Sequence, residues 1–157
     1  ATNTGSLGMG ISKAYGMAGA RVGAVFGPDD AVGAFNKVRN HFGISRMAQA
    51  GAIAALKDQA WLGQVIASVA RSRDQISDAA RACGLKPIPS ATNFVAIDCG
   101  RDGAFAKNVL DGLIARDIFV RKPAAPVLDR CIRVSCGPEP EMALFAAALP
   151  DAVREAT

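Results

Sequence analysis

The sequence contains little cysteine and almost no histidine. Its four cysteines include no Cys-x-x-Cys pair, and His41 is the one histidine among 157 residues. Because bound metal ions are usually held by clusters of these side chains, we expect no metal site. Cys99 and Cys131 stand among apolar residues and are expected in the core. A cysteine set of this kind fits a reducing, cytoplasmic location.

Long apolar runs and blocks of like charge are also missing. No segment is apolar over the thickness of a bilayer, and the first residues lack the charged and apolar regions of a signal peptide. The 18 Lys and Arg residues against 14 Asp and Glu give a net charge of +4, spread along the chain without a basic arm. We therefore expect neither a membrane nor a nucleic acid as partner. Half of the residues are hydrophobic, which is typical of a globular chain.

Hydrophobic periodicity predicts both strands and helices in the first part of the chain. Residues 5–10 are glycine-rich and are predicted to form a loop or a frayed end. The small apolar residues 20–26 predict a short buried strand. Helices are expected over residues 29–40, with two acids at the start, and over residues 45–57, with Ser45 as the cap.

The second part begins with the longest periodic segment. Apolar residues recur at three- and four-residue steps over residues 59–83, which predicts one long amphipathic helix. Beyond residue 85 the pattern predicts a strand, a helix, two strands and a closing helix. Their ranges are 93–98, 105–114, 118–121, 131–136 and 139–153. This order predicts a small α+β unit with its helices on one face of a sheet.

A lysine motif near the start of the chain carries the most specific chemistry. Ser12-Lys13 is followed by Gly19-x-Arg21-x-Gly23. An aldehyde cofactor requires an unprotonated primary amine, which Lys13 could supply. The guanidinium of Arg21 and the hydroxyl of Ser12 suit a phosphate, and the glycines let the backbone approach closely. A single lysine would indicate a surface loop, whereas the complete set favours a cofactor site.

This motif resembles the pyridoxal-phosphate lysine motif of fold-type I aminotransferases, in particular of the class II group that includes histidinol-phosphate aminotransferases. The resemblance implies that Lys13 forms an imine with pyridoxal 5'-phosphate and then serves as general base and acid. It also implies that Ser12 and Arg21 bind the cofactor phosphate. The resemblance runs from Ser12 to the C-terminus, while residues 4–11 depart from the family pattern. In the family the motif lies past the middle of the polypeptide, so we expect the C-terminal part of such an enzyme.

Two further arginines are candidate substrate-binding residues. From the alternation along residues 131–136 alone, Arg133 would be an exposed strand arginine. That segment resembles the family's C-terminal strand, whose arginine binds the substrate α-carboxylate. Residues 117–121 resemble the segment whose arginine reaches the substrate phosphate in histidinol-phosphate aminotransferases. The resemblance therefore makes Arg121 a phosphate ligand, although a structural surface arginine fits the pattern equally well.

The expected fold class is α/β, made of the end of a pyridoxal-phosphate transferase large domain followed by a small α+β C-terminal domain. Residues 1–58 would form the partial cofactor domain, and residues 59–157 the long connecting helix and the small domain. The resemblance implies a pyridoxal-phosphate-dependent aminotransferase that works as a homodimer. Its substrates would be an amino acid and a 2-oxo acid or a phosphorylated keto compound.

Two alternatives to an active aminotransferase remain open. In the family, further groups that hold the cofactor ring precede the lysine, so we expect the isolated chain to be inactive. It could then serve as a non-catalytic C-terminal domain or a self-association module, because a truncation exposes apolar patches. The other alternative is a related pyridoxal-phosphate-dependent decarboxylase, since the choice of reaction depends on how the Cα bond is aligned to the ring.

Overall fold

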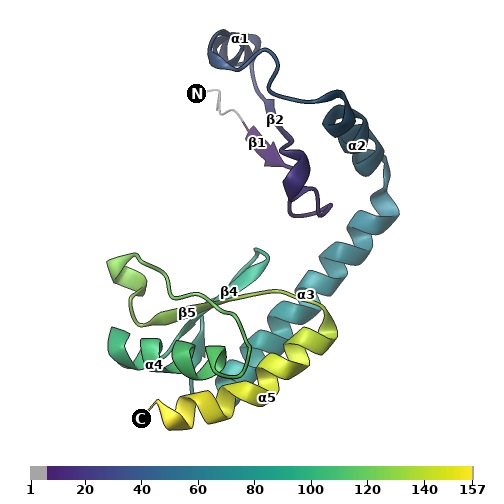
Figure 1. Cartoon of the computed structure of the whole chain (residues 1–157). Helices are drawn as coiled ribbons and strands as arrows, with labels where there is room; N and C mark the ends of the chain where they lie inside the picture. The colour runs from purple at the N-terminus through teal and green to yellow at the C-terminus, as the bar shows by residue number, and fades with distance from the viewer. Residues whose placement is uncertain (1–6, 157) are drawn as a thin grey trace. The chain divides into compact units, whose positions relative to one another are not determined.

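The long helix α3 (Gln59–Ala82) contains the point at which the chain divides into two compact units (Figure 1). The structure is a computed structural model that describes residues 7–156. The first unit ends at Ile66 and the second begins at Ala67. The described sheets do not cross this division, so each unit has a sheet of its own.

The first unit contains a two-stranded antiparallel sheet formed by β1 (Leu7–Gly10) and β2 (Gly23–Phe26). The loop predicted over residues 5–10 is therefore wrong for residues 7–10. All four residues of β1 pair with β2, because backbone pairing needs no large side chain and glycine tolerates the extended conformation. Residues 5 and 6 lie outside the part of the chain that the structure describes.

The buried strand predicted over residues 20–26 is correct only in its second half. Residue 20 ends the 3-10 turn η1 (Ala18–Ala20), and the chain becomes extended at residue 23. The predicted burial is also wrong, since Val25 and Phe26 are 44% and 55% exposed. Within residues 7–156, β2 pairs with no strand other than β1, so its side chains stay open to solvent.

Two helices follow the hairpin, close to their predicted ranges. Helix α1 (Asp29–Val38) carries two acids in its first turn, as predicted, but its cap position is Pro28. Helix α2 (Arg46–Lys57) begins after Ser45, whose hydroxyl accepts a hydrogen bond from the Ala48 amide at 3.1 Å. This bond satisfies one of the amides that a helix start leaves free, and it confirms the predicted cap.

The second unit is built on a three-stranded antiparallel sheet of order β3-β4-β5. The strands are β3 (Lys86–Pro87), β4 (Phe94–Asp98) and β5 (Cys131–Ser135). Helix α4 (Gly103–Ile114) lies between β4 and β5 in the sequence, and helix α5 (Glu139–Glu155) follows β5. The short strand β3 was not predicted from the sequence, because two residues show no periodicity.

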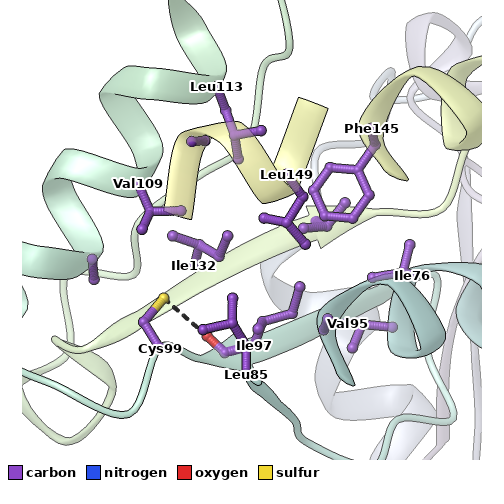
Figure 2. Close-up of a cluster of buried hydrophobic side chains, with 14 of the residues drawn as sticks. Ile76, Leu85, Val95, Ile97, Cys99, Val109, Leu113, Ile132, Phe145 and Leu149 are labelled. Carbon is purple, nitrogen blue, oxygen red and sulfur yellow. Dashed lines mark hydrogen bonds between the residues drawn. The ribbon is translucent and has the colours of Figure 1, made fainter. Parts of the chain in front are cut away.

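The core of the second unit lies against one face of this sheet. In the register of β4 and β5, Ile97 lies opposite Ile132 and Val95 opposite Val134, so these four side chains share a face. Helices α3, α4 and α5 all contribute side chains to the same cluster (Figure 2). Its largest fully buried members are Phe145, Ile76, Ile97, Leu113, Ile132, Leu149, Val95 and Val109. The other face of the sheet carries Phe94, Ala96 and Arg133, together with Asp98, Cys131 and Ser135.

The strand predicted over residues 118–121 is not formed. At the end of α4 the amide of Ile118 donates to the Leu113 carbonyl at 3.0 Å, and Asp117 adopts a left-handed conformation with φ of 59°. This is the geometry of a helix C-terminus. The helix C-terminus includes Ile118, the first residue of the segment. Only a single β-bridge, between Arg121 and Arg133, therefore joins the segment to the sheet.

Candidate functional site

Lys13, the predicted cofactor-binding lysine, lies in a turn of the first unit. The Tyr15 amide donates to the Ile11 carbonyl at 3.3 Å, which closes the turn around Ser12 and Lys13. Ile11 is only 3% exposed and anchors the start of the turn, whereas Lys13 is exposed. Neither the Ser12 hydroxyl nor the Lys13 ammonium has a hydrogen-bond or ion-pair partner among residues 7–156. Both groups are therefore available to a ligand.

Arg21 lies eight residues further on, directly after η1, and its backbone is left-handed with φ of 52°. Such a conformation is uncommon for a residue with a side chain. Nη1 of Arg21 donates to the Ala18 carbonyl at 3.1 Å, and the side chain is otherwise exposed. Because this bond uses one donor of five, most of the guanidinium remains free to bind an anion.

Arg133 and Arg121 lie together in the second unit. The Arg121 amide donates to the Arg133 carbonyl at 3.1 Å, and the Arg133 amide donates back to the Arg121 carbonyl at 2.6 Å. Residues that exchange both bonds in an antiparallel pair face each other, and their side chains point to the same side. The side chain of Arg133 alternates with the buried Ile132 and Val134, so both arginines lie on the face away from the core.

Among the described residues, no ion pair balances the positive charges of the two arginines. Like charges directly opposite each other destabilise a sheet. Among the described residues, neither Arg121 nor Arg133 forms an ion pair. Nε of Arg133 is buried without a hydrogen-bond partner in residues 7–156, and Cζ of the same side chain lies 5.0 Å from the centre of the Phe94 ring. An anionic ligand would relieve the repulsion and pair with the free donors.

Asp98, a carboxylate on this face of the sheet, is already engaged. Asp98 lies two residues from Ala96, which is the β4 partner of Arg133, and it pairs with Arg130 at 2.5 Å. Burial alone would raise the pKa of Asp98, but the Gly100 amide and the Arg130 guanidinium outweigh it and hold the pKa below the usual value. Asp98 therefore stays ionised and paired with Arg130, and Arg133 forms no ion pair with any of the described residues.

A groove of about 750 Å³ lies elsewhere in the second unit, between α3 and α5. Ala79 and Cys83 line one side, and Met142 and Val153 line the other. None of the predicted site residues borders it. Within residues 7–156, no three His, Cys, Asp or Glu side chains gather into a possible metal site, and no helix has the length and apolar character needed to cross a membrane.

The structure thus groups the predicted site residues by unit. Ser12, Lys13 and Arg21 belong to the first unit, and Arg121 and Arg133 to the second. Reasoning from the sequence missed Phe94, whose ring lies under Arg133. A correct register of β4 against β5 would have found it, because that register places Phe94 and Arg133 on one face.

Comparison with known proteins identifies the family. The sequence model of the aminotransferases of class I and II matches residues 8–149, which is nearly the whole chain. The chain belongs to this family. Histidinol-phosphate aminotransferase of Syntrophotalea carbinolica is 38% identical over 142 residues, covering 90% of this chain and 40% of the relative. That of Rhodospirillum centenum is 36% identical over 141 residues, covering 90% and 39%.

Parts of several solved structures have the same fold as this chain. Histidinol-phosphate aminotransferase from Sinorhizobium meliloti, in complex with pyridoxal-5'-phosphate, matches with a TM-score of 0.91 and 48% identity. The match covers 97% of this chain and 42% of that one. L-threonine-O-3-phosphate decarboxylase from Porphyromonas gingivalis shares the fold, with a TM-score of 0.79, 18% identity, and coverage of 95% and 46%. The chain thus spans about two fifths of the length of its curated relatives.

Proposed function

We propose that this aminotransferase-family chain contributes the cofactor-anchoring lysine and the substrate-binding arginines of a pyridoxal-phosphate-dependent aminotransferase. The reaction would move an amino group between an amino acid and a 2-oxo acid or a phosphorylated keto compound. The observation that carries the proposal is the pair of facing arginines, Arg121 and Arg133, which have no anion of the described protein to balance them. The similarity to histidinol-phosphate aminotransferases supports the substrate class.

In this proposal each of the two arginines binds a different anionic group of the substrate. Arg133 would bind the α-carboxylate through its planar guanidinium, which matches a carboxylate with two parallel hydrogen bonds. Arg121 would bind a second anion such as a phosphate, because it lies directly opposite and is more exposed. Holding the substrate at its carboxylate fixes the direction of the Cα–H bond, which accelerates a proton transfer at that carbon.

The residues of the first unit fit the chemical groups of pyridoxal phosphate. The cofactor carries an aldehyde and a phosphate, and the unit presents a free primary amine at Lys13, a free hydroxyl at Ser12 and a mostly unpaired guanidinium at Arg21. When bound, pyridoxal phosphate supplies an electron-accepting ring for chemistry at the substrate Cα. Ser12 and Arg21 would bind the phosphate. Lys13 would attach the cofactor and move the Cα proton through its Nζ.

We further propose the domain assignment and the assembly. Residues 1–58 would be the end of the large cofactor domain, and residues 59–157 the connecting helix with the small domain. A homodimer would be the working form, with an amino acid and a 2-oxo acid as substrates. The family membership supports these assignments.

The role of Lys13 is tested by cofactor attachment in the 157-residue chain. Pyridoxal phosphate is added, excess is removed by desalting, and the absorbance is recorded before and after borohydride reduction. We expect a retained band, with the reduced adduct located by mass spectrometry on Lys13. Lys13→Ala should lose both signals. Lys37→Ala is the matched control, because Lys37 is an exposed lysine of α1 outside the motif, and it should keep them.

An adduct that survives Lys13→Ala unchanged would contradict the role of Lys13.

A second candidate function, self-association without catalysis, is favoured by a segment of the first unit with three strongly exposed apolar residues. Val38, Phe42 and Met47 are 82%, 93% and 84% exposed. No retained cofactor together with concentration-dependent light scattering would support this second function in place of the first.

A further inference from the structure

We propose that Phe94 is a positioning residue for Arg133. Its ring would hold the guanidinium on the open face of the sheet and leave only the two terminal nitrogens, Nη1 and Nη2, for a carboxylate. The inference rests on the proposed function, in which Arg133 binds the substrate carboxylate. It adds a residue that touches no substrate and acts through the arginine.

The register of the sheet brings the ring and the guanidinium together. Ala96 lies directly opposite Arg133, and Phe94 lies opposite Ser135, one diagonal step away on the same face. Diagonal neighbours of this kind are about 7–8 Å apart and are within reach of long and aromatic side chains. Because the methyl group of Ala96 is small, the Arg133 side chain can lean across β4. Its Cζ consequently lies 5.0 Å from the centre of the Phe94 ring.

An aromatic ring holds a cation without neutralising it. A guanidinium within about 6 Å of a ring centre is attracted by the negative face of the ring. The ring accepts no strong hydrogen bond, so the donors of the cation stay free. Arg130, which directly precedes β5, shows the contrast, because its guanidinium is paired with Asp98 at 2.5 Å. Arg133 is therefore held in place, while the donors of its guanidinium remain free to bind an anion.

Burial of one nitrogen limits how a carboxylate can approach. Nε of Arg133 is buried and has no hydrogen-bond partner in the part of the chain that the structure describes. A carboxylate can bind arginine side-on, through Nε and one terminal nitrogen, or end-on, through both terminal nitrogens. Since Nε is not accessible, the end-on arrangement remains. The buried and unpaired Nε is also unfavourable by itself, and the attraction of the ring compensates for part of this unfavourable term.

The contact itself is tested by nuclear magnetic resonance on the 157-residue chain. A proton above an aromatic ring is shifted upfield, so we expect an upfield Arg133 Nε–H signal that exchanges slowly with water. Phe94→Tyr keeps a ring and should keep the shift, whereas Phe94→Leu should lose it. An unchanged Arg133 signal in Phe94→Leu would overturn the inference directly.

The positioning role is tested by titration with sodium propionate at constant ionic strength, followed through the backbone amide shifts of β5. Phenylalanine at position 94 is replaced by mono-, di- and pentafluorinated analogues, which weaken the negative ring face with little change of shape. We expect a stepwise loss of affinity that reaches about threefold or more. The same analogues at Phe105 are the matched control, because Arg101 lies 4.6 Å above that ring, and they should leave propionate affinity unchanged.

Arg133→Gln separates the inference from the proposed function. If Arg133→Gln abolishes propionate binding while fluorination at Phe94 has no effect, Arg133 binds the carboxylate without help from the ring, and the inference alone fails. If propionate still binds to Arg133→Gln with the affinity of the unsubstituted chain, the proposed role of Arg133 fails and the inference fails with it. A stepwise loss at Phe94 and a complete loss in Arg133→Gln support both.

Discussion

Cys99 shows how burial sets the chemistry of a single side chain. It is 3% exposed, and its Sγ lies 3.9 Å from the Ile97 carbonyl, to which the thiol donates. Burial raises the pKa of the Cys99 thiol to about 11, an effect that the Ile132 amide opposes and the neighbouring Cys131 and Asp98 reinforce. The protonated thiol is thus the form that the fold prefers.

We expect this preference to make stability fall at alkaline pH. In the unfolded chain the thiol titrates near 9.0, so the folded chain binds more protons between about pH 9 and 11. The contribution is complete below pH 9 and is lost as pH rises toward 11, by an amount on the order of 2 kcal/mol. Urea unfolding at pH 8 and 10.5 should show a smaller pH effect in Cys99→Ala. An equal pH effect in both proteins would contradict the assignment.

Among single residues, the predicted core positions of Cys99 and Cys131 are confirmed, because both thiols stand among apolar neighbours and are buried. The roles of the lysine motif and of the two arginines stay predictions, which came from the resemblance to a family. The partners of these residues are not recognisable in the same way. The ring of Phe94 meets Arg133 across two strands that are far apart in the sequence, so the contact depends on the register and not on any local pattern.

At the scale of elements, the contact of α4 with α5 depends on a glycine. A Cβ added at Gly112 would lie 3.2 Å from both Cα and Cβ of Ala152 on α5. Ala152 is completely buried, and its backbone is fixed within a helix, so it cannot easily move away. The close approach of the two helices therefore requires a residue without a side chain at this position.

We expect Gly112→Ala to lower the free energy of unfolding, although alanine favours a helix. The gain in helix propensity is about 1 kcal/mol, whereas overpacking typically loses about 1–3 kcal/mol, which leaves a net loss of about 1 kcal/mol. Gly63 in α3 is the matched control, because no atom of the described residues that could clash lies within 4 Å of its added Cβ. Gly63→Ala should show higher helicity and no loss of stability by circular dichroism. Stabilisation by both substitutions would show that α5 moves away freely.

Elements with a clear periodic pattern were predicted well, including the short strands β4 and β5, whose ranges match the structure to within one residue. Strand β1 and the segment 118–121 were not. Helix α3 lies within one residue of its predicted end, because apolar positions recur over its whole length. Strand β1 consists of Leu-Gly-Met-Gly, a composition that indicates a loop, and only its pairing with β2 makes it a strand. The segment 118–121 has the apolar composition of a strand, but the helix end before it uses its first residues.

At the scale of the molecule, the two units differ in how much apolar surface they bury. In the second unit one cluster joins three helices and the sheet. In the described part of the first unit, the buried residues are Ile11, Ala48 and Ala52, and the last two are small. Buried apolar area is the main source of stability. Opening the second unit therefore requires far more free energy than opening the first.

Hydrogen exchange should separate the units accordingly. We expect slow amides in β4, β5 and α5, whose opening requires disruption of the core, and fast amides in β1, β2 and α1. Exchange followed by mass spectrometry of peptides from the two units measures this difference. Comparable protection of the β1–β2 hairpin and of β5 in the 157-residue chain would contradict it.

The facing arginines have a consequence for how this family member could change over generations. Replacing either one with a neutral residue would relieve the repulsion in the ligand-free fold, so a chain selected for folding alone would gain by losing Arg121. An anion that binds only the folded form would reverse this balance by mass action. Selection for stability and selection for binding would then act on this position in opposite directions, and the binding face would be lost before the fold.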